Sequence, residues 1–214
     1  MTLLEDCVRK DLDTKAPRTM AVIEPLKVRI TNLDKEIVVE TPLFPKHPDA
    51  GTRKVTLEQT IFIEKKDFRE IDDPDFFGLA PGKEVGLKYC GLIKCEKVVK
   101  DENGSILELE CTYSSEVKKI KGRIHWIGLK DSVRATINMY DYLFSTDEVN
   151  LKQIIEEINP SSLIVFDRAL VHKSVANNSL KNLMHFQFER KGYFVVDKDT
   201  NVEVHRFVFN FTVS

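Results

Sequence analysis

The chain has 214 residues, of which 42% are apolar and 31% charged, and its 32 Lys and Arg residues against 34 Asp and Glu residues leave a net charge of −2. A chain of this length forms one or two domains and can bury a sizeable core. The ordinary composition excludes a disordered tail or a collagen-like chain. Its apolar runs are far shorter than the roughly 20 residues that cross a bilayer, and no charged-then-apolar leader opens the chain, so we expect a soluble protein that was never exported.

Cys7, Cys90, Cys95 and Cys111 form no CxxC pair, and no histidine is placed to complete a zinc site with them. Because a core of this size needs no disulfide staples, we expect reduced thiols in a cytosolic protein.

The apolar spacing changes once along the chain. Residues 3–12 have helical spacing, and Pro17 disfavours helix at the residue before it, so a short amphipathic helix is expected first. Beyond Pro17 the period falls to near two in the segments 54–64, 106–113 and 133–140, which predicts strands with one buried face. Asn103-Gly104 marks the tip of a hairpin.

Only 148–158 and 178–184 suggest further helices, and no internal repeat is visible. Many short strands at roughly ten-residue intervals, separated by turn residues, favour a mainly β fold of sandwiches or barrels. Charge is uneven along the chain: residues 67–76 hold five acids and one Arg, whereas residues 115–134 hold six Lys and Arg residues against two acids. A neutral chain can therefore carry a basic face that suits RNA.

No pattern in the sequence predicts catalysis. The motifs GxGxxG, GxxxxGK[ST], GxSxG and HExxH are absent, and the five histidines stand far apart. Asp72, Asp73 and Asp75 lack the spacing of a calcium loop and indicate a solvated acidic segment. We therefore expect neither a catalytic centre nor a metal site in this chain.

Two segments offer binding chemistry. In KKIKGRIHWIG, alternation places Ile120, Ile124 and Trp126 on one face of a predicted strand and Lys119, Lys121 and Arg123 on the other. That pattern fits either a half-buried strand with a solvated face or a surface that binds RNA phosphates.

In MHFQFERKGYF, Phe186 and Phe188 share the inner face and Gln187 projects outward. Strict alternation places Gln187 and Arg190 on opposite faces, so both meet one ligand only if the strand ends or twists before Lys191-Gly192.

Several strings, in order, carry a resemblance to a known family: LEDCVRKDLDTKAPRTMAV, PLKVRITN, DFRE, APGKEVGLK, CTY, KGRIHWIG, YDYLF, INPSSL and FQFERKGYF. Together they resemble the C-terminal half of the glutaminyl-tRNA synthetases, from the end of the helical connector through the anticodon-binding region. The resemblance spans about residues 3–213. The related glutamyl-tRNA synthetases of eukaryotic and archaeal type share this architecture and remain an alternative, although APRTMAV followed by PLKV is closer to the glutaminyl type.

The resemblance implies two β-barrels, one interrupted in sequence by the other. By the family pattern, residues 1–16 end the connector, residues 17–66 and 138–214 form the barrel nearer the catalytic body, and residues 67–137 form the outer barrel. The ATP-binding signatures HIGH and KMSKS are absent from the sequence. The resemblance thus implies that ATP and Mg serve only the full-length ligase, that this part has no catalytic residue, and that it needs no cofactor of its own.

The family's anticodon contacts carry over to Arg18, Lys46, Lys88, Gln187 and Arg190. Gln187 and Arg190 match the residues that read the middle and last letters, because an amide both donates and accepts and a guanidinium pairs with guanine. Lys88 stands where the family has an arginine for the first letter, and Lys46 where the bacterial enzyme has an asparagine. Gly78 stands in place of an arginine that supports last-letter reading, so Arg190 acts alone there or Lys83 or Arg69 substitutes.

The partners implied are tRNA(Gln), a catalytic domain of the same chain and multi-synthetase partners, in the cytoplasm and without a membrane. Lys119, Lys121 and Arg123 are the candidate phosphate contacts. Two rival interpretations stay open: a free-standing RNA-binding barrel of the ribosomal 5S-rRNA-binding type, and a structural or protein-interaction module that binds no tRNA.

Overall fold

The computed structural model describes residues 2–116, 118–146, 148, 154–177 and 179–214. In these ranges the chain forms one α-helix, α1 (Thr2–Lys15), three short 3₁₀ turns, η1 (Pro48–Ala50), η2 (Lys65–Asp67) and η3 (Lys173–Val175), and sixteen strands in three sheets. The expected N-terminal helix and the mainly β fold are confirmed.

The first sheet joins the two ends of the chain, and we call it the terminal barrel. Its strand order is β1 (Arg18–Thr19), β14 (His185–Phe188), β15 (Gly192–Val196), β16 (Val208–Val213), β12 (Ser132–Tyr140), β13 (Leu163–His172) and β2 (Ala21–Val22). Only Met20 separates β1 from β2, so the two edges of this sheet belong to one segment. The sheet therefore curls back on itself.

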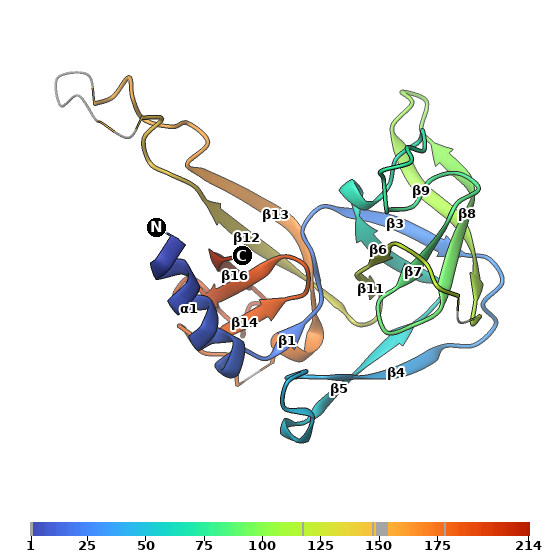
Figure 1. Ribbon diagram of the computed structural model, residues 1–214, viewed down its shortest axis with the longest axis horizontal. Coiled ribbons are helices and arrows are strands. Elements are labelled where there is room, and N and C mark those ends of the chain that lie inside the picture. Colours follow the sequence, from blue (N-terminus) through green and yellow to red (C-terminus); the bar gives the residue numbers. More distant parts are fainter. Residues whose placement is uncertain (1, 117, 147, 149–153, 178) are drawn as a thin grey trace.

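The second sheet, the inserted barrel, has the order β10 (Arg123–Ile124), β7 (Glu84–Leu87), β8 (Leu92–Lys100), β9 (Ile106–Ser114), β3 (Pro25–Ile30), β6 (Thr60–Glu64) and β11 (Trp126–Gly128). Here His125 alone separates the two edge strands, so closure follows the same scheme. The remaining sheet is a hairpin of β4 (Ile37–Pro42) and β5 (Thr52–Leu57). Figure 1 shows the two barrels side by side, with this hairpin along the lower edge.

The two barrels share one pattern of strand directions. Read from β1 or from β10, successive pairs are parallel, antiparallel, antiparallel, parallel, antiparallel and antiparallel. The closing segment comes first along the chain in the terminal barrel and last in the inserted one. The chain thus repeats a fold that no repeat in the residue sequence had indicated.

Strand pairing corrects the barrel boundaries that the resemblance implied. β3 and β6 lie inside 17–66, which was assigned to the barrel nearer the catalytic body, yet both belong to the sheet of the inserted barrel. Conversely, β12 begins at Ser132, inside the range 67–137, and pairs within the terminal barrel. The reason is strand pairing within the inserted barrel, because β9 pairs with β3 as well as with β8, and β11 pairs with β6.

The two further helices fare differently. Residues 149–153 lie outside the described residues, and residues 154–157 form turns rather than helix. Over the described part of 178–184 the helix prediction is wrong, because this segment bonds to a distant residue. The backbone N–H of Leu183 donates to the carbonyl of Val196, and the backbone N–H of Val196 donates to the carbonyl of Met184. Leu183 also has a positive φ of 66°, which a helix excludes.

Aromatic side chains fill the terminal barrel. Phe188 stacks on Phe194 with 4.5 Å between ring centroids and meets Phe209 edge-on at 5.4 Å, and all three are fully buried. Trp126 and Leu87 belong to the separate core of the inserted barrel. These three phenylalanines therefore form part of the core of the terminal barrel.

The β12–β13 hairpin extends beyond the terminal barrel as an arm, at the upper left of Figure 1. Large apolar side chains on it are exposed, namely Tyr140, Tyr142, Leu143, Ile154, Ile155, Ile158, Leu163, Ile164 and Val165. In the part of the chain that the structure describes, no helix is long and apolar enough to span a bilayer.

Candidate nucleic-acid interface

The turn between β14 and β15 brings the two motif residues together. β14 ends at Phe188, and Arg190 adopts a left-handed backbone conformation with a φ of 64°. The alternation of the strand is thereby broken before Gly192, as joint use of Gln187 and Arg190 required. Both side chains line one pocket of about 470 Å³.

This pocket, which we call the cationic pocket, lies between the C-terminal half of α1 and the β14–β15 turn. Its side chains are mostly basic, and its lining comprises Arg9, Lys10, Asp13, Lys46, Gln187, Arg190, Lys191, Gly192, Tyr193 and Ser214. The lining holds five cations and one aspartate, and three of the cations also pair with acids outside the pocket: Arg9 with Asp6, Arg190 with Asp67 and Lys191 with Glu64. Arg9 and Lys10 were not predicted, because on a helix read alone they are ordinary solvated residues.

Arg18 and Lys46 sit at the edge of the cationic pocket. Arg18 is the direct strand partner of Gln187 across β1 and β14. Its Nη2 lies 3.5 Å from Oδ1 of Asp13, and Lys46 on the β4–β5 loop also pairs with Asp13. Three predicted contacts, Lys46, Gln187 and Arg190, thus line the pocket, and the fourth, Arg18, stands beside them and also lines a neighbouring cavity of about 310 Å³.

Lys88 belongs to the inserted barrel, directly after β7, and does not line the cationic pocket. Its ammonium pairs with the buried carboxylate of Glu189 and lies 5.3 Å from the ring centre of Tyr89. Glu189 directly follows the strand that carries Gln187, so Lys88 reaches the same turn from the opposite barrel.

Three consecutive residues of the β14–β15 turn each bind the inserted barrel, and we call this set the inter-barrel clasp: Glu189, Arg190 and Lys191. Glu189 accepts from Tyr89 at 2.7 Å and from Lys88, Arg190 makes a bidentate pair with Asp67 at 2.6 and 2.9 Å, and Lys191 lies 2.8 Å from Glu64. Their partners lie more than 60 residues away in sequence, so no local pattern indicated the clasp.

Buried His125 links Arg190 of the clasp to Glu64, the partner of Lys191. Its Nδ1 accepts from Arg190 at 3.0 Å, and its Nε2 lies 3.4 Å from Oε1 of Glu64. Because an arginine only donates and a carboxylate accepts, the neutral Nε2–H form fits both contacts. Burial by itself raises the pKa of Glu64, but hydrogen bonds from His125 and Lys191 outweigh it and lower that pKa to about 2.

The packing around Gly78 explains why no arginine stands at this position. A Cβ at this position would lie 2.4 Å from the backbone oxygen of Asp67 and 2.3 Å from the ring of Phe76, so a side chain does not fit. Of the two possible substitutes, Lys83 bonds to Asp72 at 2.5 Å, and the guanidinium of Arg69 lies 4.4 Å from the ring centre of Phe76. Both are engaged within the acidic loop.

Lys119, Lys121 and Arg123 are exposed, and Ile124 and Trp126 are buried, as alternation predicted. The segment is not one regular strand, because β10 begins only at Arg123. None of the three cations lines the cationic pocket, and Lys121 lines a different cavity of about 320 Å³ beside the acidic loop. The structure therefore does not bring them to the predicted base-reading residues.

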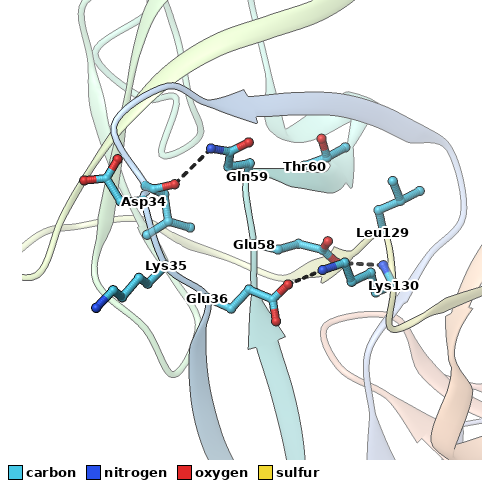
Figure 2. A pocket seen from close by; sticks show the side chains of 9 residues that line it. Asp34, Lys35, Glu36, Glu58, Gln59, Thr60, Leu129 and Lys130 are labelled. Carbon is cyan, nitrogen blue, oxygen red and sulfur yellow. Dashed lines mark hydrogen bonds and ion pairs between the residues drawn. The ribbon is translucent and has the colours of Figure 1, made fainter.

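A further pocket of about 370 Å³ lies on the inserted barrel and is drawn in Figure 2. Lys130 pairs there with Glu36 through its side chain and with Glu58 through its backbone N–H, and Gln59 donates to the backbone oxygen of Leu33. These polar groups satisfy one another, so the pocket offers no reactive arrangement. Among the described residues, no group of three or more metal-binding side chains gathers.

Comparison with known proteins agrees with this geometry. The family model described as "tRNA synthetases class I (E and Q), anti-codon binding domain" matches residues 16–114, and a second model of the same description matches residues 123–197. A probable glutamine--tRNA ligase of Dictyostelium discoideum is 45% identical over 99% of this chain and 27% of its own length.

Glutamine--tRNA ligases of Bradyrhizobium diazoefficiens and Haemophilus influenzae are each 39% identical, over 92% and 99% of this chain and 37% and 39% of their own lengths. The chain thus spans well under half of the curated relatives it matches. With two matched models covering most of its residues, the chain belongs to the anticodon-binding domains of the class I tRNA synthetases for glutamate and glutamine.

Proposed function

We propose that this chain reads the anticodon of a glutamine tRNA on behalf of the catalytic domain of a glutamine--tRNA ligase. The observation that carries the proposal is the convergence of Lys46, Gln187 and Arg190 on one cationic pocket, with Arg18 beside it. The glutamine type is favoured over the glutamate type because the relatives named above are glutamine--tRNA ligases.

The chemistry of the pocket suits an unstacked RNA loop. The Gln187 amide can donate and accept at once, which is what a splayed uracil edge requires. Arg190 already gives Nη1 and Nη2 to Asp67, so a base reaches it through its remaining N–H groups or by exchange with that carboxylate. Lys10, which is exposed and lines the pocket, supplies charge for the phosphates, which position the loop without reading it.

The remaining partners are those that the family resemblance implies. In the whole ligase, ATP and Mg would be bound by the catalytic domain, and the enzyme would act in the cytoplasm, within a larger synthetase assembly in some cases. The exposed apolar side chains of the β12–β13 arm are suited to contact with another polypeptide of such an assembly.

Gln187→Ala is expected to weaken binding of the glutamine anticodon loop by about 1 to 3 kcal/mol, because a base edge loses its paired amide. The same variant should change the affinity for a tRNA with a different middle letter far less. Filter binding or fluorescence anisotropy at one fixed salt concentration measures both.

Gln59→Ala is the matched control, since Gln59 lies in the separate pocket of Figure 2 and donates only to Leu33. It should leave discrimination unchanged. Equal losses for every tRNA in Gln187→Ala would contradict letter reading and favour a general RNA-binding barrel, and no salt-dependent tRNA binding by the wild type would favour a protein-interaction module.

Replacing Lys119, Lys121 and Arg123 together by alanine should weaken binding of every tRNA alike. If all three contact phosphates, the slope of log affinity against log salt falls by up to about two or three units, because counterion release scales with the charges neutralised. A triple alanine variant of Lys94, Lys97 and Lys100 on β8 removes the same charge elsewhere on this barrel. Equal slopes in the two triples would remove the segment 119–123 from the RNA-binding surface.

A further inference from the structure

Asp13 is the acid at the centre of the cationic pocket. Its carboxylate accepts from Lys46, lies 3.5 Å from Nη2 of Arg18, and accepts from the hydroxyl of Tyr193 at 3.3 Å. These partners come from three separate parts of the fold: the β4–β5 loop, β1 and β15. One carboxylate therefore orients two of the five predicted anticodon contacts.

The stability of α1 does not explain an acid at this position. Asp13 stands in the last turn of the helix, where the macrodipole disfavours negative charge. Its partners all lie outside the helix, whereas neighbouring Asp11 bonds to Lys15 at 2.6 Å on the same helix. The position of Asp13 is instead explained by the cations of the pocket that it faces.

Asp13 is negatively charged in the RNA-free protein at neutral pH. The hydrogen bond from Lys46 is the main influence and holds the pKa of Asp13 below its usual value. A phosphate that approaches Lys46 or Arg18 therefore meets an anion that already binds both of them. RNA binding through phosphate contacts alone is therefore weakened at the cationic pocket.

We propose that Asp13 is a specificity-determining residue, which holds Arg18 and Lys46 in their reading positions and opposes binding by phosphate contact alone. The inference rests on the proposed reading of the anticodon. A non-cognate loop binds chiefly through its phosphates and is therefore the more strongly opposed. A cognate loop also gains hydrogen bonds between its bases and the side chains that Asp13 holds in place. The binding of a cognate loop is therefore opposed less. Selectivity of this kind comes from a repulsive element as well as from attractive contacts.

The test compares Asp13→Asn with Asp11→Asn, which removes the same charge two residues away on the same helix. Affinities for a glutamine tRNA transcript and for transcripts with one anticodon letter changed are measured at several salt concentrations. In Asp13→Asn we expect non-cognate binding to strengthen about 3- to 10-fold while cognate binding changes less. The cognate to non-cognate ratio should fall about threefold or more. The salt slope should steepen by up to about one unit, because a further cation becomes free for phosphate.

Asp11→Asn should leave the ratio and the slope near those of the wild type. If Asp13→Asn strengthens cognate and non-cognate binding by the same factor, or matches Asp11→Asn, Asp13 does not determine specificity and the inference is wrong. If the wild type itself makes no distinction between the transcripts, the proposed function fails, which is a separate result. Circular dichroism of both variants confirms that the helix and barrels remain folded.

Discussion

Glu189→Ala is expected to lower the free energy of unfolding by about 3 to 5 kcal/mol, among the largest losses for one side chain in this protein. Glu189 is 2% exposed, and its carboxylate binds Arg53, Lys88 and Tyr89. Without it, the guanidinium of Arg53, itself 4% exposed, stays buried without its counter-charge. Removing one partner of a buried pair costs far more than the net gain that the intact pair provides. Urea unfolding at pH 7 measures the loss.

Glu36→Ala serves as the control for this experiment. Glu36 also pairs with a lysine, Lys130, but their side chains are 45% and 67% exposed. Exposed pairs contribute at most about 1 kcal/mol, so this variant should unfold close to the wild type. A loss in Glu189→Ala no greater than in Glu36→Ala would show that the inter-barrel clasp does not hold the barrels together.

The second large effect concerns pH. Burial is the main influence on His172 and, with the nearby charge of Arg53, lowers its pKa to about 4, against the opposing attraction of Asp131. Lys173 adds a further, smaller repulsion. The unfolded histidine, with a pKa near 6.5, binds more protons than the folded one between pH 6.5 and 4, so stability falls as the pH drops through that window. From pH 7 to pH 5 the loss from this one group is about 2 kcal/mol.

Comparing His172→Gln with the wild type isolates this contribution. Glutamine does not titrate, so the unfolding free energy of the variant should change by about 2 kcal/mol less between pH 7 and pH 5. Staying at pH 5 or above avoids the range in which Glu64 and Asp131 lose their charge contributions. His47→Gln, which replaces an exposed histidine, controls for the loss of one imidazole. Parallel curves for His172→Gln and the wild type would show that His172 titrates normally in the folded protein.

Local sequence pattern predicted the elements well where the pattern was regular. The helix over 3–12, the buried face of 54–64 and the hairpin at Asn103-Gly104 all follow from short-range spacing and turn chemistry. In 106–113 the prediction holds for Leu109 and Cys111, which are buried, but Leu107 is exposed. The helix expected over 178–184 failed because backbone groups of Leu183 and Met184 bond to Val196. A long-range partner of this kind is invisible in a local window.

The residues of the candidate site also fall into those that the sequence identified and those that it did not. The FQFER string identified Gln187 and Arg190, and the break in alternation that they needed was stated from the spacing alone. The charged partners of Arg190 and Lys88 were not identified, because Asp67 and Arg190 are 123 positions apart and Lys88 and Glu189 are 101 apart. Nothing in either neighbourhood distinguishes such residues from solvated surface charges.

By itself, then, the sequence determined the strand character, the N-terminal helix, the family and the residues proposed to meet bases. Those properties depend on neighbours a few positions apart or on strings that a family shares. Only the tertiary structure decided how the strands divide between the two barrels, which cations gather in one pocket, and which acids restrain them. Barrel closure and charge pairing join residues that are distant along the chain, and their free energies depend on burial and geometry that no local pattern specifies.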